Sequence, residues 1–231
     1  MSQRALAILS GGQDSTTCLF WALKRFGTNH VEALTFDYDQ RHRIELHSAR
    51  AVAALVNVPH TILPINTFAA IGGNALTDPG IAPSSSDTPS ALPNTFVPGR
   101  NLVFLTFAGA FAYQRGITHL VAGMAQTDYS GYPDCRENTL ETLMQAINLG
   151  METEFTLHTP LMHATKKETV LLAQNLGALK SMALTHTCYE GLRPPCGTCP
   201  ACRLRAKGFT EAGISDPLLD SPIPQIIQPI S

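Results

Sequence analysis

Short apolar runs alternate along this chain with longer segments in which apolar residues recur at helical spacing. Apolar runs that end in polar or glycine-rich turns predict buried β-strands, here at residues 5–9, 31–36, 61–63, 117–122 and 155–157. Helical periodicity predicts helices after the first turn (through Leu23) and at residues 44–58, 101–115, 139–149 and 166–176. Because strands and helices alternate, we expect a parallel sheet with right-handed crossovers and helices on both faces.

The pattern changes twice along the chain and so suggests an organisation into parts. Residues 72–99 are rich in glycine, proline and serine and have little periodicity, which is typical of either an unstructured insertion or a lid over a ligand. We predict an α/β domain at 1–184, a small cysteine-containing subdomain at 185–212 and a proline-rich tail at 213–231, in which residues 216–231 are extended and peripheral.

Composition narrows the class of protein. With 231 residues, 44% hydrophobic and 15% charged, the chain can bury a sizeable core, and no apolar run approaches the ~20 residues of a membrane helix. Met1 to Arg4 lead directly into the first strand, so we expect no signal peptide and a cytoplasmic location. A net charge of −2 disfavours binding to a polyanion and favours a small substrate.

The first strand runs into Ser10-Gly11-Gly12-Gln13-Asp14-Ser15, which opens the first helix. Two successive glycines allow consecutive N–H groups to point into one concavity, and the positive end of the helix adds to this anion site. Asp14, Ser15 and Thr16 are residue types that cap helix starts. The spacing is neither that of a Walker loop nor GxGxxG. An ordinary strand-to-helix turn with a serine cap is the alternative.

A second chemical signal lies near the end of the chain, where four thiols stand within fifteen residues: Cys188, Cys196, Cys199 and Cys202. Two overlapping CxxC turns and one upstream ligand can close a tetrahedron, which suits zinc, while an Fe–S cluster or unligated cysteines are alternatives. Four sulfur ligands leave no open position, so the expected role is structural. Four basic residues in this segment could contact RNA or simply be solvated: Arg193, Arg203, Arg205 and Lys207.

The SGGxDS loop resembles the PP-loop of the ATP pyrophosphatases, which release AMP and pyrophosphate. Further segments resemble the 7-cyano-7-deazaguanine synthases, the QueC family, in family order over nearly the whole chain. Besides the cysteine cluster they are Phe36-Asp37-Tyr38, Gln40-Arg41-His42, Phe96 to Asn101, Thr127-Asp128, Ser130 to Arg136 and Thr159-Pro160-Leu161. The resemblance implies a Rossmann-like PP-loop fold of the adenine nucleotide alpha hydrolase type with a small C-terminal zinc subdomain.

The resemblance also implies an activity. A ligase of this family converts 7-carboxy-7-deazaguanine and ammonia to 7-cyano-7-deazaguanine (preQ0) on the path to queuosine, through an adenylated acid and an adenylated amide. Two Mg-ATP are consumed as co-substrates, and each subunit of a homodimer holds one structural zinc. We expect no membrane and no stable nucleic-acid partner.

The matching positions carry expected roles. The catalytic residues are expected to be Ser10, Asp14, Ser15 and Lys166. The ATP-binding residues are expected to be Leu9, Ser10, Gly11, Gly12, Gln13, Asp14, Ser15, Thr16, Thr17, Cys18, Leu19, Arg100 and Asn101. The residues that bind the deazapurine are expected among Gln40, Arg41, Phe96, Asp128, Tyr132, Asp134 and Glu137.

Plainer interpretations stand beside several of these roles. Lys166 at a helix start is commonly just solvated, and Asn101 is an ordinary helix cap type. The sequence also departs from the family at two positions, since Asp39 stands where glycine is usual and Thr165 where aspartate is common. Neither position is needed by the reaction.

Two other functions compete with nitrile synthesis. A PP-loop tRNA sulfurtransferase would need a catalytic thiol, for which Cys135 in a polar loop is a better candidate than Cys18 inside the first helix. A nucleotide-gated zinc module that binds nucleic acid without turnover is the alternative from a different class, and the net charge speaks against it.

Overall fold

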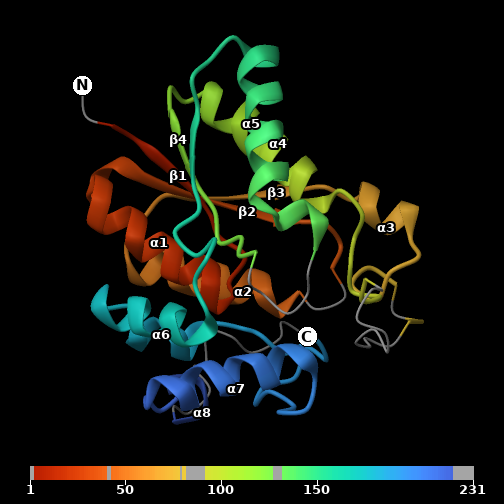
Figure 1. The fold of residues 1–231 in the computed structure, drawn as a ribbon, viewed down its shortest axis with the longest axis vertical. Coiled ribbons are helices and arrows are strands. Elements are labelled where there is room, and N and C mark those ends of the chain that lie inside the picture. The colour runs from red at the N-terminus through yellow and green to blue at the C-terminus, as the bar shows by residue number, and fades with distance from the viewer. Residues whose placement is uncertain (1–2, 41–42, 79, 82–91, 127–131, 221–231) are drawn as a thin grey trace.

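The computed structural model describes residues 3–40, 43–78, 80–81, 92–126 and 132–220. Five parallel strands form one sheet in the order β3-β2-β1-β4-β5 (Figure 1). The strands are β1 (Ala5–Ile8), β2 (Val31–Asp37), β3 (His60–Pro64), β4 (His119–Val121) and β5 (Thr156–His158). The predicted fold class is therefore confirmed.

Helices occupy the connections and the C-terminal part. The α-helices are α1 (Gln13–Phe26), α2 (Ile44–Leu55), α3 (Thr67–Ile71), α4 (Arg100–Tyr113), α5 (Glu137–Met151), α6 (Lys166–Asn175), α7 (Pro200–Ala212) and α8 (Pro217–Asp220). Three short 3₁₀ helices are η1 (Thr28–His30), η2 (Pro133–Cys135) and η3 (Leu179–Leu184). As Figure 1 shows, α4 and α5 lie on one side of the sheet, α1 and α2 lie on the other, and α6 and α7 form a further layer beyond α1.

The sheet is buried on both faces, and alternate residues of β1 belong to different cores. Leu6 packs with residues of α4 and α5, such as Leu105 and Leu140, whereas Ala5 and Ala7 pack with residues of α1 and α2. Side chains of a strand point alternately to opposite faces, so both sets must be apolar when helices cover both faces. This explains why the strands appear as continuous apolar runs.

The strand order places a ligand site. The chain moves outward in one direction from β1 to β2 and β3, and returns to the other side of β1 with β4 and β5. In open parallel sheets the crevice at such a reversal, beyond the carboxyl ends of the strands, is where ligands bind. The first turn of α1, which follows the loop after β1, meets the loop after β4, residues 122–126, there, since a Cβ on Gly123 would lie 3.0 Å from Ser15 N.

The predicted strands and helices are found, with ends that differ by at most three residues, but the C-terminal part departs from the sequence prediction. Residues 216–220 are neither extended nor peripheral. Asp216 is 9% exposed, accepts the Leu218 N–H and forms an ion pair with Arg205, whose side chain is 3% exposed. Helices α3 and α8 were not predicted, because helices of five and four residues leave little periodicity to detect. Helix α7 was missed for another reason: its buried face includes Arg205 and Gly208, so apolar residues do not recur at helical spacing.

Two of the four basic residues of the cysteine segment make contacts inside the protein. Arg205 is buried, and Arg193 donates to the carbonyl oxygens of Ala183 and Thr185. For these two arginines both sequence interpretations, RNA contact and a solvated surface, are wrong.

Within the described residues, no helix has the length and apolarity needed to cross a membrane.

The buried ion pair predicts a large effect on stability. Replacing Asp216→Ala leaves the Arg205 guanidinium buried without its charged partner, and we expect the free energy of unfolding to fall by about 3–5 kcal/mol. Urea denaturation followed by circular dichroism measures it. Lys207→Ala is the control on the same helix, because its pair with Glu211 is exposed and worth under about 1 kcal/mol. Equal losses for both variants would contradict the assignment.

Candidate active site

The loop between β1 and α1 is held by its own serines. The Ser10 and Ser15 hydroxyls lie 3.0 Å apart, Ser15 Oγ accepts the Ser10 N–H at 3.2 Å, and it donates to Gly12 O at 3.1 Å. Ser10 Oγ accepts the Gly12 N–H at 3.4 Å. The two side chains thus fix the turn before any ligand binds. We call residues 9–16 the phosphate loop.

Gly11 packs directly against the first turn of α2. Its φ is +87°, in the region that favours glycine, and a Cβ there would lie 2.3 Å from Glu45 O and 2.8 Å from Ala49 N. No side chain fits in this space. The requirement for glycine therefore has two independent physical causes, backbone conformation and close approach.

The start of α1 is left open for a ligand. Gly12 is the N-cap, and no side chain of the described residues caps the helix, so the expectation that Asp14, Ser15 or Thr16 does so is wrong. Three buried side-chain atoms in this first turn have no hydrogen-bond partner in the described part of the chain: Gln13 Nε2, Asp14 Oδ1 and Thr16 Oγ1. Unpaired buried polar atoms are costly, and a bound phosphate with its cation would satisfy such groups.

Lys166 reaches the phosphate loop from α6. Its Nζ donates to Asp14 Oδ2 at 2.6 Å, and its side chain is only 12% exposed, so the interpretation as a solvated lysine is wrong. Thr165 orients the helix start through a capping box with Glu168, which explains how threonine replaces the usual aspartate. The pair places a positive charge and an available carboxylate oxygen at the open end of α1.

A second polar group surrounds Arg100 at the start of α4. The guanidinium stacks over the Tyr38 ring at 5.5 Å and donates to the Tyr38 hydroxyl at 3.4 Å. Burial raises the pKa of Tyr38 to about 12 and that of Glu45 to about 7, and Arg100 opposes both shifts. Since Glu45 O also lies against Gly11, the first turn of α2 joins this group to the phosphate loop.

Asp134 and Asn101 are joined by a hydrogen bond, although Asp134 was expected to bind the deazapurine and Asn101 to bind ATP. Asp134 is 4% exposed, and its Oδ2 accepts the Asn101 backbone N–H at 3.0 Å, so Asp134 supports the start of α4. The Asn101 side chain donates to Cys135 Sγ at 3.2 Å. The N-cap of α4 is Gly99, so the interpretation of Asn101 as the cap is wrong.

Of the remaining substrate candidates, Phe96 and Tyr132 contact each other. Phe96 and Tyr132 lie with ring centroids 5.4 Å apart, and the Tyr132 hydroxyl is 2.7 Å from Thr95 Oγ1. Gln40 is buried and accepts the Tyr38 N–H, and Glu137 is half-exposed beside His163. The candidates Arg41 and Asp128 lie outside the described residues.

The other expected nucleotide residues face the core. Leu9, Thr17, Cys18 and Leu19 are at most 1% exposed, so any part they take in nucleotide binding is confined to the backbone. The Cys18 thiol lies 3.6 Å from Ala122 O, and burial raises its pKa strongly. This fits the expectation that Cys18 is a structural thiol.

The four C-terminal cysteines form a compact cluster whose ligand atoms all lie within 4.8 Å of one another. Cys196 Sγ and Cys202 Sγ are 3.9 Å apart, close to the ~3.8 Å expected for sulfurs around a tetrahedral zinc with Zn–S bonds of about 2.3 Å. The N–H of Cys199 donates to Cys196 Sγ and is the main cause that lowers the pKa of Cys196 to about 6, whereas burial raises the pKa of Cys199 and of Cys202. The donor set therefore fits a structural metal.

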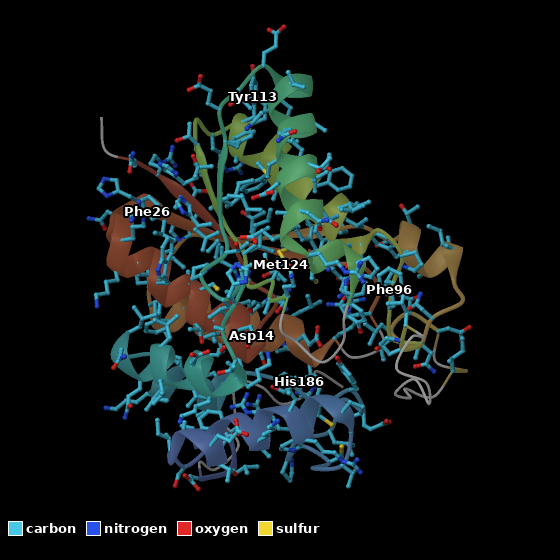
Figure 2. The ribbon with its side chains drawn as sticks, viewed as in Figure 1. Asp14, Phe26, Phe96, Tyr113, Met124 and His186 are labelled. Atoms are coloured by element: carbon cyan, nitrogen blue, oxygen red, sulfur yellow. The ribbon has the colours of Figure 1, made fainter. Side chains whose placement is uncertain are left out.

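Sequence reasoning did not single out Glu45, His186 or Gly208. His186 donates its N–H to Gly11 O at 2.9 Å, and a Cβ on Gly208 would lie 2.9 Å from Lys166 Cβ. Figure 2 shows Asp14 and His186 where α1 faces the layer of α6 and α7. Of these three residues, only Glu45 could have been found from the sequence, because it closely follows the polar segment 37–43 at the carboxyl end of β2.

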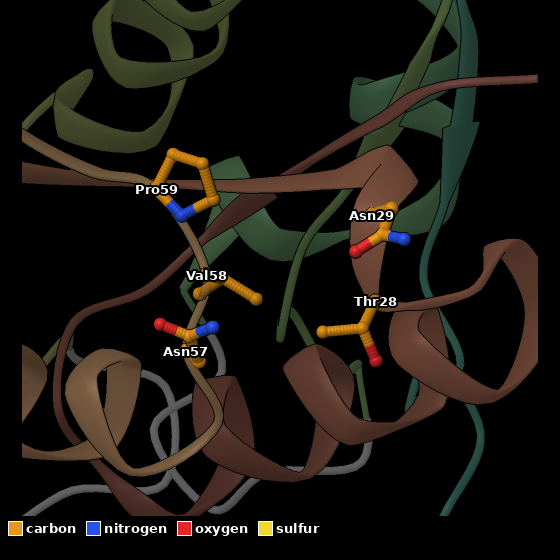
Figure 3. Close-up of a pocket in the computed structure, with 5 residues that line it drawn as sticks. All are labelled: Thr28, Asn29, Asn57, Val58 and Pro59. Atoms are coloured by element: carbon orange, nitrogen blue, oxygen red, sulfur yellow. The ribbon is translucent and has the colours of Figure 1, made fainter.

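A hollow of about 480 Å³ elsewhere on the molecule is lined by Thr28, Asn29, Asn57, Val58 and Pro59 (Figure 3). These residues precede β2 and β3, so the hollow lies at the amino ends of the strands. It carries no titratable side chain and is remote from the phosphate loop.

The fold and the site together define an α/β protein of the nucleotide-binding type, with a glycine turn before its first helix and a four-cysteine cluster whose donor set fits a metal. The family model described as "Queuosine biosynthesis protein QueC" matches residues 4–213, and the chain belongs to this family. It is 67% identical to the 7-cyano-7-deazaguanine synthase of Chromobacterium violaceum over 94% of each chain. It is 64% identical to that of Laribacter hongkongensis over 94% of this chain and 95% of the other. These matches confirm the resemblance seen in the sequence.

Close packing at Gly11 yields a direct prediction. We expect Gly11→Ala to weaken nucleotide binding more than tenfold and to lower the free energy of unfolding by at least about 2 kcal/mol, because its Cβ collides with α2 and its φ is unfavourable. Calorimetric titration with α,β-methylene-ATP and urea denaturation measure these effects. The matched control is Gly150→Ala in α5, where a Cβ would meet no described atom within 4 Å and helix propensity improves. Unchanged binding in Gly11→Ala would contradict this packing.

Proposed function

We propose that the chain is a 7-cyano-7-deazaguanine synthase, a ligase that makes a nitrile from 7-carboxy-7-deazaguanine and ammonia at the expense of two ATP. The observation that carries the proposal is the Lys166–Asp14 pair at the open start of α1. It lies in a chain that is 67% identical to a protein of that name.

The chemistry explains why such a site is needed. The substrate carboxylate attacks the α-phosphate of ATP, forming an acyl adenylate and releasing pyrophosphate; ammonia then displaces AMP and gives the amide. The amide oxygen attacks a second ATP, again releasing pyrophosphate. Loss of AMP and protons leaves the nitrile. The two adenylations form bonds from substrate oxygen to phosphorus, and each of these oxygens then leaves carbon as part of AMP. The protein therefore chiefly positions reactants and stabilises phosphate charge.

The phosphate loop supplies these functions in our proposal. Its backbone N–H groups, with Ser10 and Ser15, hold the β- and γ-phosphates and leave the α-phosphate exposed to attack. Asp14 Oδ1 would hold a magnesium ion through one of its waters, and Lys166 would neutralise charge on the leaving pyrophosphate. Arg100 adds a positive charge from the opposite side.

The deazapurine is proposed to bind near the start of α4. The rings of Phe96 and Tyr132 offer a stacking surface, and a carboxylate is the natural partner for the N–H and amino edge of a guanine-like base. Asp134 and Glu137 are the candidates. Gln40 supports the site from the end of β2.

Other features of the family complete the proposal. The cysteine centre holds one zinc, the enzyme is a homodimer, and it works in the cytoplasm without a membrane or stable nucleic-acid partner. The division into domains at 1–184, 185–212 and 213–231 stays a proposal as well.

Product analysis tests the function. Purified protein incubated with ATP, ammonium and 7-carboxy-7-deazaguanine should give the nitrile with two AMP and two pyrophosphates per product, measured by mass spectrometry and a pyrophosphate assay. Formation of ADP, or no nitrile in the presence of bound zinc and native fold, would refute the proposal.

The fate of Cys135 separates nitrile synthesis from sulfur transfer. The thiol is partly buried beside Asn101 and Asp134, and nitrile synthesis has no sulfur step. We therefore expect Cys135→Ser to keep at least about a tenth of the wild-type kcat for the nitrile. Complete loss of turnover in a folded, zinc-loaded variant would favour the sulfurtransferase alternative.

A further inference from the structure

The segment of residues 185–189 links the cysteine cluster to the phosphate loop. The His186 N–H donates to Gly11 O at 2.9 Å, and His186 O would lie 3.5 Å from a Cβ on Gly12. The His186 ring is 3% exposed, and its Nε2 lies 2.8 Å from Cys188 O. One residue thus bonds to the loop through its backbone and to the backbone of a metal ligand through its ring.

Two arginines of the cysteine segment hold this link in place. Arg193 Nη2 donates to Thr185 O at 3.0 Å, and Arg205 Nη1 donates to the hydroxyls of Thr185 and Thr187 at 2.8 and 3.0 Å. Arg193 lies between Cys188 and Cys196, and Arg205 follows the last ligand on α7. Because charged hydrogen bonds are strong and directional, these contacts tie the link to the cysteine segment.

The same segment also contacts the lysine side of the site. Gly208 of α7 faces the start of α6, where an added Cβ would lie 2.9 Å from Lys166 Cβ and 3.0 Å from Lys166 O. This close approach of α7 to α6 fixes the distance between the Lys166 backbone and α7. Its Nζ meets Asp14 Oδ2 on the far side. The cysteine segment therefore reaches both halves of the phosphate site by separate contacts.

We propose that His186 and Gly208 are positioning residues, through which the metal-bound cysteine segment holds the phosphate loop and Lys166 in the geometry that binds nucleotide. The metal centre then does more than staple the C-terminal part, because its occupancy sets nucleotide affinity. This inference rests on the proposed function, in which the loop binds ATP.

The first test removes the ring contact. His186→Ala should weaken binding of α,β-methylene-ATP about tenfold by calorimetry and speed amide hydrogen exchange in residues 9–16, with the zinc content unchanged. His30→Ala is the matched control, since its Nδ1 also lies 3.1 Å from a backbone carbonyl oxygen, that of Phe26, but at the amino ends of the strands. It should leave affinity and loop exchange unchanged. Equal affinities for wild type and His186→Ala would overturn the proposal.

The second test uses helix packing and the metal. Gly208→Ala should raise the Kd for the nucleotide about tenfold, whereas Gly150→Ala should not change it. Partial removal of zinc with a chelator should weaken binding in proportion to the zinc lost, and readded zinc should restore it. Normal affinity at low zinc content would overturn the coupling. Wild-type protein that binds no nucleotide would instead refute the proposed function itself.

Discussion

The contact between Gly11 and α2 is the constraint on which the site depends. Because the loop backbone touches the backbone of Glu45 and Ala49, the loop cannot turn in any other direction, and α1 begins with its N-terminus open. That contact requires α2 to lie close to the sheet, which small residues on this face of β1 and β2, such as Ala7 and Ala33, allow. The packing of the core therefore determines the shape of the anion site.

The phosphate loop combines unpaired buried polar atoms with closely packed surroundings. Buried polar atoms of Gln13, Asp14 and Thr16 have no hydrogen-bond partner in the described part of the chain, which costs stability. Their positions are nevertheless fixed by well-packed surroundings on α1, α6 and the loop after β4. A site built in this way loses little entropy when its ligand binds, and the ligand in turn satisfies the exposed start of the helix.

Much of this fold could be predicted from the sequence, and the reason is physical. Strands buried on both faces produce apolar runs, and two adjacent glycines between a strand and a helix are a strong local signal for a phosphate-binding turn. Contacts between distant segments could not be predicted, because nothing local to Asp216 indicates Arg205, and nothing local to Gly208 indicates Lys166. Asp134 shows the same limit: its residue type suits a base, but nothing local to it indicates that it also accepts the Asn101 N–H at the start of α4. The left-handed φ of 59° at Asp39 explains why glycine is usual there.

The hydrogen bond from His186 to Gly11 connects residues that the ribosome makes at widely separated times. During translation Gly11 is made 175 residues before its partner His186. The sheet can assemble around β1 during translation. The loop forms its hydrogen bond with His186 only after that residue has left the exit tunnel. A nascent chain therefore has the phosphate loop long before it has the site.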